Sequence, residues 1–277
     1  MNALEKFLQP ISKWRMETPE FYGAFHLIWL GVAVIACALI FFLRRKISPK
    51  AVDITLIVWG VVLILLEILK QLLSSCHFSA DGASWSYAWW AFPYQFCSSP
   101  LLIAIPAGAL KRGKIKQALY NFLSTYTLFA GIAVMFYPAN VFGGSAFLNY
   151  HSMFWHSSMV AVCFMLHATK TVKPSFKGLL SATVVFAVMA VIALILNIAI
   201  GDKVNLFYIS PYVPFPVPIV KLIWESVPFP VYFILYLLGF SIAAGLMFAI
   251  SYGVSKLKCA YVNTKIKKAN PDGTCDA

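Results

Sequence analysis

The sequence predicts an all-α polytopic membrane protein, a bundle of seven transmembrane helices with its N-terminus outside and its C-terminus in the cytoplasm. Three observations indicate this class. Hydrophobic residues make up 61% of the 277 residues and charged residues only 12%, whereas soluble domains are usually about 45–50% apolar. The apolar residues form runs of roughly the 20 residues that a helix needs to cross a membrane. Basic residues gather in short clusters between these runs, a pattern that orients helices in a bilayer.

The apolar runs define the predicted spans, of which the third and fifth are the shortest. In chain order they cover residues 21–43, 52–74, 94–110, 118–142, 151–168, 179–200 and 230–254. No internal repeat and no low-complexity linker separates them. We therefore expect one transmembrane domain over residues 21–255, preceded by an interfacial segment of residues 1–20 and followed by a basic cytoplasmic tail of residues 256–277.

The basic clusters set the predicted orientation. Four Lys or Arg lie in residues 44–50, four in residues 111–116, three in residues 170–177 and five after Ser255, whereas the loop at residues 75–93 has none. Connections rich in Lys and Arg stay in the cytoplasm. Three basic residues in the N-terminal segment are an exception to this pattern, since seven spans place that segment outside.

Two of the predicted outer loops have a distinctive composition. Residues 75–93 contain Trp85, Tyr87, Trp89 and Trp90, as expected for a segment at the level of the lipid headgroups. Residues 201–229 contain five prolines, which exclude a continuous helix. We expect this second loop to form an extended or re-entrant cover over the bundle, because such backbone must be buried in protein or face water.

The composition also bears on partners and cofactors. The formal net charge of +12 could indicate nucleic acid, but the basic clusters lie between apolar runs, so we expect membrane lipid and no nucleic acid as partner. The six cysteines show no CxxC or Cys/His spacing, so the sequence predicts no metal site and no cofactor. It indicates no particular oligomeric state.

The stretch Phe-Pro-Tyr-Gln-Phe-Cys-Ser-Ser-Pro, residues 92–100, carries the first candidate site residues. Cys97 lies a few residues inside the outer end of the third span, where the positive end of the helix dipole favours a thiolate. Gln95 and Ser98 flank it, and polar groups clustered in a span are costly unless they face a cavity. A small core residue, or a disulfide with Cys76, is the alternative for Cys97.

Two histidines at the outer start of the fifth span lie at a similar depth. A histidine within hydrogen-bond reach is the usual base that activates a thiol. His151 and His156 are five residues apart, about 140° around a helix, so only one is expected to meet Cys97. His156 is the deeper of the two. The alternative for either is a hydrogen-bonded structural histidine.

Further polar residues lie toward the same side. Glu67 and Lys70 are three apart in the second span, so they can neutralise one another as an intramembrane ion pair or act as a polar staple between helices. Asn197, Asn205 and Glu225 complete the set. We expect these residues to orient the base or to bind a polar headgroup.

Three stretches resemble a known family. Phe-Pro-Tyr-Gln-Phe-Cys-Ser (92–98), the pair His151 and His156, and Leu-Asn-Ile-Ala-Ile-Gly-Asp-Lys-Val-Asn-Leu-Phe-Tyr-Ile (196–209) are similar to landmark stretches of the YwaF-like integral membrane proteins of bacteria. That family is similar to a eukaryotic seven-helix acyltransferase of ether phospholipids, and more distantly to androgen-induced membrane hydrolases.

The resemblance implies a multi-pass protein of the bacterial cytoplasmic membrane. It implies that Cys97 is the acyl-accepting nucleophile and His156, in preference to His151, the general base. Two positions depart from the family pattern, because Gln95 stands where many relatives have a histidine or another polar residue and Phe92 replaces a leucine. Gln95 can donate a hydrogen bond to an oxyanion but cannot act as a base, so the base must come from the fifth span.

Together these observations predict an enzyme, a cysteine-dependent acyltransferase or ester hydrolase acting on a phospholipid or other acyl lipid at the outer leaflet. Two alternatives come from other classes. A small transporter or ion-coupled carrier would use Glu67, Lys70 and His156 along a polar pathway. A non-catalytic integral membrane protein would need none of these residues.

Overall fold

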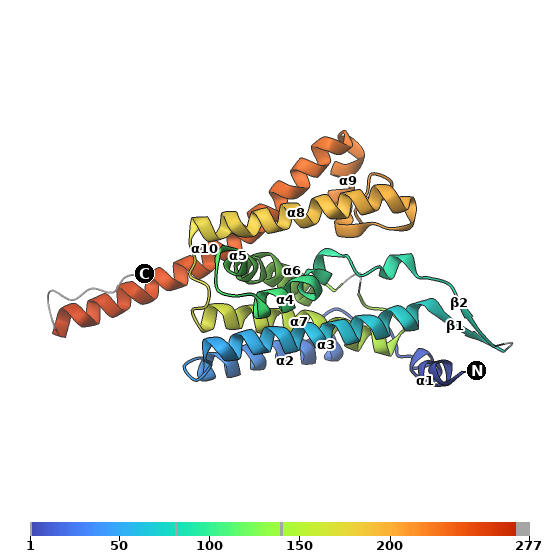
Figure 1. The fold of residues 1–277 in the computed structure, drawn as a ribbon, viewed down its shortest axis with the longest axis horizontal. Helices are drawn as coiled ribbons and strands as arrows, with labels where there is room; N and C mark the ends of the chain where they lie inside the picture. Colours follow the sequence, from blue (N-terminus) through green and yellow to red (C-terminus); the bar gives the residue numbers. More distant parts are fainter. Residues whose placement is uncertain (1, 81, 139–140, 270–277) are drawn as a thin grey trace.

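The fold is a bundle of long helices, as the computed structural model shows for residues 2–80, 82–138 and 141–269 (Figure 1). Within these residues the only sheet is a hairpin of two short antiparallel strands. The all-α class is therefore confirmed. The longer elements are α1 (Ala3–Ser12), α2 (Ala24–Leu43), α3 (Pro49–Ser75), β1 (Cys76–Ser79), β2 (Gly82–Trp85), α4 (Ser99–Ala109), α5 (Lys114–Phe122), α6 (Leu128–Phe136), α7 (Ala146–Ala168), α8 (Phe176–Ile200), α9 (Pro218–Ser226) and α10 (Phe229–Ala269).

Five helical stretches in the described part of the chain are long and apolar enough to cross a membrane. They are α2, α3, the continuous stretch from α5 to α6, α8 and the first part of α10. The helix at residues 96–109 is apolar but shorter, and α7 has 23 residues but is not among the five. The protein is thus a multi-pass membrane protein, and the count of seven spans remains a prediction.

The bundle has two ends of different character. We call one the hairpin end, because it carries β1 and β2 together with α1, the start of α7 and the loop after α8 (right in Figure 1). The other, the basic end, carries the basic residues 44–50, 111–116 and 170–177. The predicted orientation places the basic end in the cytoplasm.

Several helix boundaries differ from the predicted ones. The third span does not begin at Tyr94: residues Phe96–Ser98 form a 3-10 turn, and α4 begins at Ser99 with Pro100 in its first turn. Proline has no N–H to donate, so the first turn, where that N–H would have no partner within the helix, suits Pro100 well. The fourth span ends at Phe136 rather than residue 142, because the residue before Pro138 avoids the helical conformation.

The fifth span begins earlier than predicted, and the last one ends later. Ser145 caps α7 by accepting a hydrogen bond from the Leu148 N–H, so the helix starts at Ala146 and His151 lies more than one turn inside it. Helix α10 continues to Ala269, so no change of secondary structure marks the predicted boundary at residue 255. The last part of the predicted tail, residues 270–277, lies outside the described residues.

The middle of the fourth span is a short π-helix, Leu123–Thr127, between α5 and α6. All five of its residues are buried. Such π turns inside α-helices are frequent at functional sites. Here the widened turn places the Thr127 hydroxyl 3.4 Å from that of Ser99, the first residue of α4.

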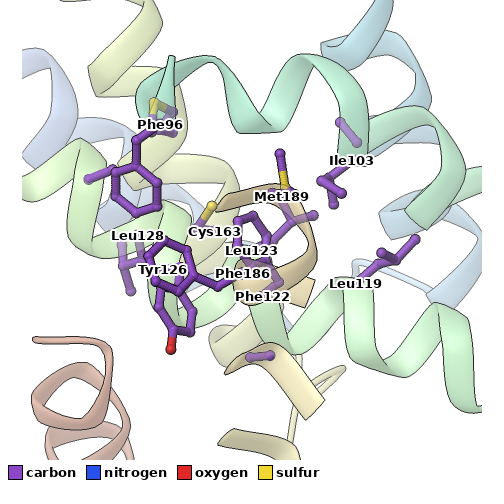
Figure 2. Close-up of a cluster of buried hydrophobic side chains, with 14 of the residues drawn as sticks. Phe96, Ile103, Leu119, Phe122, Leu123, Tyr126, Leu128, Cys163, Phe186 and Met189 are labelled. Atoms are coloured by element: carbon purple, nitrogen blue, oxygen red, sulfur yellow. The ribbon is translucent and has the colours of Figure 1, made fainter. Parts of the chain in front are cut away.

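Aromatic side chains from several helices fill the core (Figure 2). The ring of Phe96 points into this cluster, with its centroid 5.7 Å from that of Phe186 on α8 and 4.8 Å from that of Phe240 on α10. The proline-rich loop partly follows the prediction. It is irregular, apart from two 3-10 turns and α9, and residues Leu206, Phe207 and Ile209 are fully buried at the hairpin end.

Helices α3 and α4 pack so closely that glycine is required at their contact. A Cβ atom on Gly108 of α4 would lie 2.6 Å from the backbone oxygen of Asp53, and one on Gly60 of α3 would lie 2.6 Å from Cγ1 of Ile105. At the basic end, the Lys116 ammonium lies 2.9 Å from the Asp53 carboxylate and also donates to the carbonyls of Gly108 and Leu110. This contact fixes the position of α4, and with it the turn that carries Cys97.

Candidate functional site

Cys97 lies in the 3-10 turn before α4, and two contacts hold this turn in place. On one side Phe96 is buried in the aromatic core. On the other side the indole N–H of Trp155 on α7 donates a 2.8 Å hydrogen bond to the Cys97 carbonyl oxygen. Cys97 and the histidine-bearing part of α7 are therefore neighbours, at the depth in the bundle that the sequence predicted for both.

The Cys97 thiol is free, and so is that of Cys76, so the two do not form the disulfide considered as an alternative. Tyrosine side chains from two other elements lie near the thiol. Burial, with a smaller contribution from Cys97, raises the pKa of Tyr208 in the loop after α8 to about 12. The hydroxyl of Tyr236 on α10 is buried without a hydrogen-bond partner, and its ring centroid lies 4.4 Å from that of Phe240, which packs on Phe96 beside Cys97.

The hydrogen bonds of His156 determine which of its nitrogens carries a proton. Its Nδ1 lies 2.7 Å from the backbone carbonyl oxygen of Ser152, one turn earlier on α7. A carbonyl oxygen only accepts, so Nδ1 carries the proton and donates it. The Nε2 atom is buried without a partner, and because an unpaired buried charge is very costly, the ring is neutral with a free lone pair on Nε2.

His151 lies on a different face of α7, as its spacing from His156 predicts. Its ring stacks on Trp155, with centroids 5.3 Å apart, and its Nε2 atom also lacks a hydrogen-bond partner. Since neither Nε2 atom has a partner among the described residues, neither histidine is bonded to the Cys97 thiol in this structure. The turn and the two imidazoles are brought together through Trp155.

His26, which the sequence also places near this end, contrasts with them. Its Nδ1 accepts a hydrogen bond from the Tyr22 N–H, and its Nε2 donates to the Met135 carbonyl oxygen at 2.7 Å. Both ring nitrogens are thus used, Nδ1 to hold the segment before α2 and Nε2 to tie α2 to α6, and His26 is a structural histidine.

A second polar group lies on α3 beside the same end of α7. Glu67 and Lys70 form the predicted ion pair, with 2.8 Å between the Lys70 Nζ and the carboxylate. The Gln71 amide donates to Glu67 at 2.6 Å and also to the Ala91 carbonyl oxygen. Glu67 is only 4% exposed, and one of its carboxylate oxygens has no partner.

The unpartnered buried polar atoms all lie in the hairpin-end half of the bundle. Most buried polar atoms in proteins are hydrogen-bonded, and a group of exceptions marks a place kept for another purpose. In the described part of the chain these atoms are Oε2 of Glu67, Oε1 of Gln71, Oγ of Ser74, Oε1 of Gln95, Nε2 of His151, Nε2 of His156 and the hydroxyl of Tyr236. We call this group, together with Cys97, the polar site.

Comparison with known proteins identifies the family. A family model described as the TMEM164 family matches residues 21–252, a range that includes every residue of the polar site. The chain belongs to the TMEM164 family. No curated protein and no solved structure matches it.

The remaining predicted site residues of this TMEM164-family protein lie apart from the reactive groups or serve the backbone. The Asn197 amide bonds to the N–H and the carbonyl of Leu206, at 2.8 and 2.9 Å. Asn205 similarly binds the backbone of Val213, Pro214 and Ser210. Glu225 is half exposed and pairs with Lys221, and Ser98 is buried next to Cys97. The two asparagines thus hold the loop that brings Tyr208 to Cys97.

Four further residues of the site were not predicted from the sequence: Trp155, Tyr208, Tyr236 and Gln71. Trp155 lies directly before His156, and Tyr208 lies within the stretch 196–209. Both therefore belong to the segments that the sequence motifs had already singled out. Tyr236 is one of many aromatic residues in an apolar helix, and only the packing of α10 against the 3-10 turn distinguishes it from the rest.

Proposed function

We propose that this protein is a cysteine-dependent acyltransferase or ester hydrolase that acts on a membrane lipid at the outer leaflet. The observation that supports it best is the state of His156, a buried neutral imidazole whose Nδ1 proton is held by the Ser152 carbonyl and whose Nε2 lone pair is unoccupied. This is the state in which a histidine accepts a proton. The candidate nucleophile is the thiol of Cys97, whose carbonyl is bonded to the residue before His156.

In the proposed reaction, the Cys97 sulfur attacks the carbonyl carbon of a lipid ester while the thiol proton passes to Nε2 of His156. The sulfur–carbon bond forms, the ester carbon–oxygen bond breaks, and the departing lipid oxygen takes the proton back from the imidazole. The thioester is then attacked by a hydroxyl group of a second lipid, which is transfer, or by water, which is hydrolysis. In both cases Nε2 accepts the proton of the attacking hydroxyl group, the sulfur–carbon bond breaks, and the Cys97 sulfur takes that proton back from the imidazole.

Other groups of the polar site suit the charge that develops on the ester oxygen. Helix α4 begins two residues after Cys97, and the positive end of its dipole favours an anion there. The unpartnered Tyr236 hydroxyl is a second donor. Because the thiol and Nε2 are not bonded in the free protein, the proposal requires that a bound substrate draws them together, as catalytic hydrogen bonds often tighten only in the substrate complex.

The resemblance of the stretches around Cys97, His151 and Asn197 to YwaF-like proteins adds support. Through those proteins it suggests a relation to an acyltransferase of ether phospholipids, and it favours a location in the bacterial cytoplasmic membrane. The one-sided position of the unpartnered polar atoms favours a site open to one leaflet over the two-sided pathway of a carrier.

The test is to trap the acyl-enzyme. Membranes containing the protein are incubated with a phospholipid whose acyl chain ends in an alkyne, and the denatured protein is coupled to a fluorophore and then treated with hydroxylamine, which cleaves thioesters. We expect hydroxylamine-sensitive labelling of the wild type, none of Cys97→Ala, and at least about 100-fold slower labelling of His156→Ala, the usual contribution of a general base. The control Cys37→Ala removes a thiol on α2 and should label normally.

Labelling that persists in Cys97→Ala would refute the nucleophile, and normal labelling of His156→Ala would refute the base. A complete absence of labelling, together with lipid or ion uptake by reconstituted vesicles that Glu67→Gln abolishes, would replace the enzyme with the carrier.

A further inference from the structure

A cavity of about 470 Å³ opens at the hairpin end, beside the polar site. Its volume is in the range of small-molecule sites, roughly 300–1,000 Å³. It is formed by the end of α1 and the segment after it, the end of α3, strand β1, the 3-10 turn that carries Trp90 and the start of α7. Its lining residues are Ile11, Ser12, Lys13, Arg15, Leu73, Ser74, Cys76, His77, Phe78, Trp90, Ser145, Phe147 and Leu148.

The charged residues of the cavity are all basic. Lys13 and Arg15 contribute two positive charges, and no carboxylate lines the cavity. Neither side chain forms an ion pair within residues 2–80, 82–138 and 141–269. Two unpaired cations around one cavity favour an anionic ligand, and an Arg fork beside a Lys point charge matches phosphate.

The backbone that carries these cations is fixed to α7. Arg15 pairs with Ser145 in a β-bridge. The Ala146 N–H donates to the Trp14 carbonyl at 3.1 Å, and the Met16 N–H donates to the Gly144 carbonyl at 3.2 Å. The two basic side chains are thus presented from an ordered edge at the N-terminus of α7.

That helix N-terminus adds to the positive field. Ser145 is the N-cap of α7, and Phe147 and Leu148 of its first turn line the cavity. The Ala146 and Leu148 N–H groups already have partners, so this N-terminus contributes the positive field of its dipole, which favours an anion. Ser74, whose hydroxyl oxygen is buried without a partner, lines the opposite side from α3.

The rest of the lining is apolar, which selects an amphipathic ligand. Leu73, Phe78, Trp90 and Phe147 offer contact surface for the glycerol and upper acyl chains of a lipid. The neighbouring loop exposes Trp85, Tyr87 and Trp89, residues typical of the headgroup level of a membrane. A lipid-borne phosphate fits these surroundings better than a free one.

We propose that this cavity binds the phosphate of an anionic phospholipid headgroup. A zwitterionic headgroup has an ammonium group, which would find two cations and no carboxylate here. Ser74 lies one turn from Lys70 on α3, and Phe147 lies one turn from His151, with ring centroids 5.7 Å apart, so a bound lipid lies beside the polar site. Its role as a substrate, unlike its binding, rests on the proposed function.

The test measures binding of tail-labelled phosphatidylglycerol to the purified full-length protein in detergent micelles, with tail-labelled phosphatidylcholine and inorganic phosphate as further arms. We expect phosphatidylglycerol to bind at least about tenfold more tightly than phosphatidylcholine. The double variant Lys13→Ala/Arg15→Ala should lose about tenfold or more in affinity, the effect of losing one or more charge-assisted hydrogen bonds. A matched control, Lys221→Ala, removes a positive charge from the same end, where Lys221 pairs with Glu225 on α9 away from the cavity, and should bind within about twofold of the wild type.

Equal affinity for the two lipids, or unchanged binding by the Lys13→Ala/Arg15→Ala variant, would overturn the proposal. Competition by millimolar inorganic phosphate would show a free-phosphate site and overturn the lipid assignment. A variant that no longer elutes as a single species is replaced by Arg15→Gln, which keeps a polar side chain but removes the charge and should still weaken binding. A wild-type protein that binds phosphatidylglycerol as expected but forms no hydroxylamine-sensitive acyl-enzyme would refute the proposed function alone.

Discussion

The substitution Gly108→Ala tests whether the contact between α3 and α4 is as close as the structure shows. The Cβ atom that it adds would lie 2.6 Å from the backbone oxygen of Asp53 and 2.7 Å from Cγ1 of Ile57. Ordinary contacts of this kind begin at 3.4 Å. Because the oxygen belongs to the backbone, no side-chain rotation relieves the clash, and α4 has to move away from α3 by about 0.8 Å.

Two opposing effects set the size of the change. Overpacking of a tight interface costs about 1–3 kcal/mol, and alanine is favoured over glycine in a helix by about 1 kcal/mol. We expect a net destabilisation of up to about 2 kcal/mol. Gly31→Ala on α2 is the matched control, because nothing lies within 4 Å of the Cβ atom that it adds and only the helix preference remains, a gain of up to about 1 kcal/mol.

Thermal unfolding in detergent measures the difference, with a dye that fluoresces on reacting with cysteines as they become exposed. At about 2–4 °C per kcal/mol, Gly108→Ala should melt roughly 5–10 °C below Gly31→Ala. The lipid-labelling rate of Gly108→Ala should also fall, since α4 positions Cys97. Equal melting temperatures for the two variants would refute the close contact.

Three further outcomes follow from the structure. Asn197→Ala removes two buried hydrogen bonds to Leu206 and should destabilise the protein by about 2–4 kcal/mol, measured by the same thermal unfolding. The raised pKa of Tyr208, about 12 against the usual 10, means that its contribution to stability is complete below pH 10 and is lost as the pH rises toward 12; Tyr208→Phe should flatten this loss in a pH series of melting temperatures. A membrane-impermeant maleimide added to intact cells should label Ala80→Cys at the hairpin end and not Lys111→Cys at the basic end, because the basic end is predicted to be cytoplasmic.

Each of these three predictions can be contradicted by one specific result. A melting temperature of Asn197→Ala equal to that of the wild type would mean that the loop holding Tyr208 does not depend on the amide. Identical pH profiles for the wild type and Tyr208→Phe would refute the role of that phenol. Labelling of Lys111→Cys but not of Ala80→Cys would invert the orientation.

The helices themselves could be located from sequence, because long apolar runs have few other ways to fold. Their ends were harder to place. Ser145 lies in a polar loop, and its cap on α7 depends on a hydrogen bond to Leu148 that hydropathy does not register. The π turn at Leu123–Thr127 has no signature in a run of buried residues, since one extra residue per turn changes neither length nor polarity noticeably.

The candidate site could likewise be predicted only in part, because hydropathy does not register the hydrogen bonds that join its residues. Cys97 and the two histidines could be picked out, because a few polar residues stand out in an apolar chain, and their depth followed from the order of the spans. The contact that joins them could not, because it is made by the indole N–H of Trp155, one of eight tryptophans in the chain. Asn197 and Asn205 were expected near a headgroup, but their amides bind backbone.

The sequence by itself determined that this protein is a helical membrane protein with a sparse set of reactive groups, because hydrophobic length and composition are properties of each segment alone. The tertiary structure decided what those groups can do. Which nitrogen of His156 is free depends on the Ser152 carbonyl, and which cations face a common cavity depends on how the segment after α1 pairs with the start of α7. Both are relations between atoms that only a folded backbone brings together.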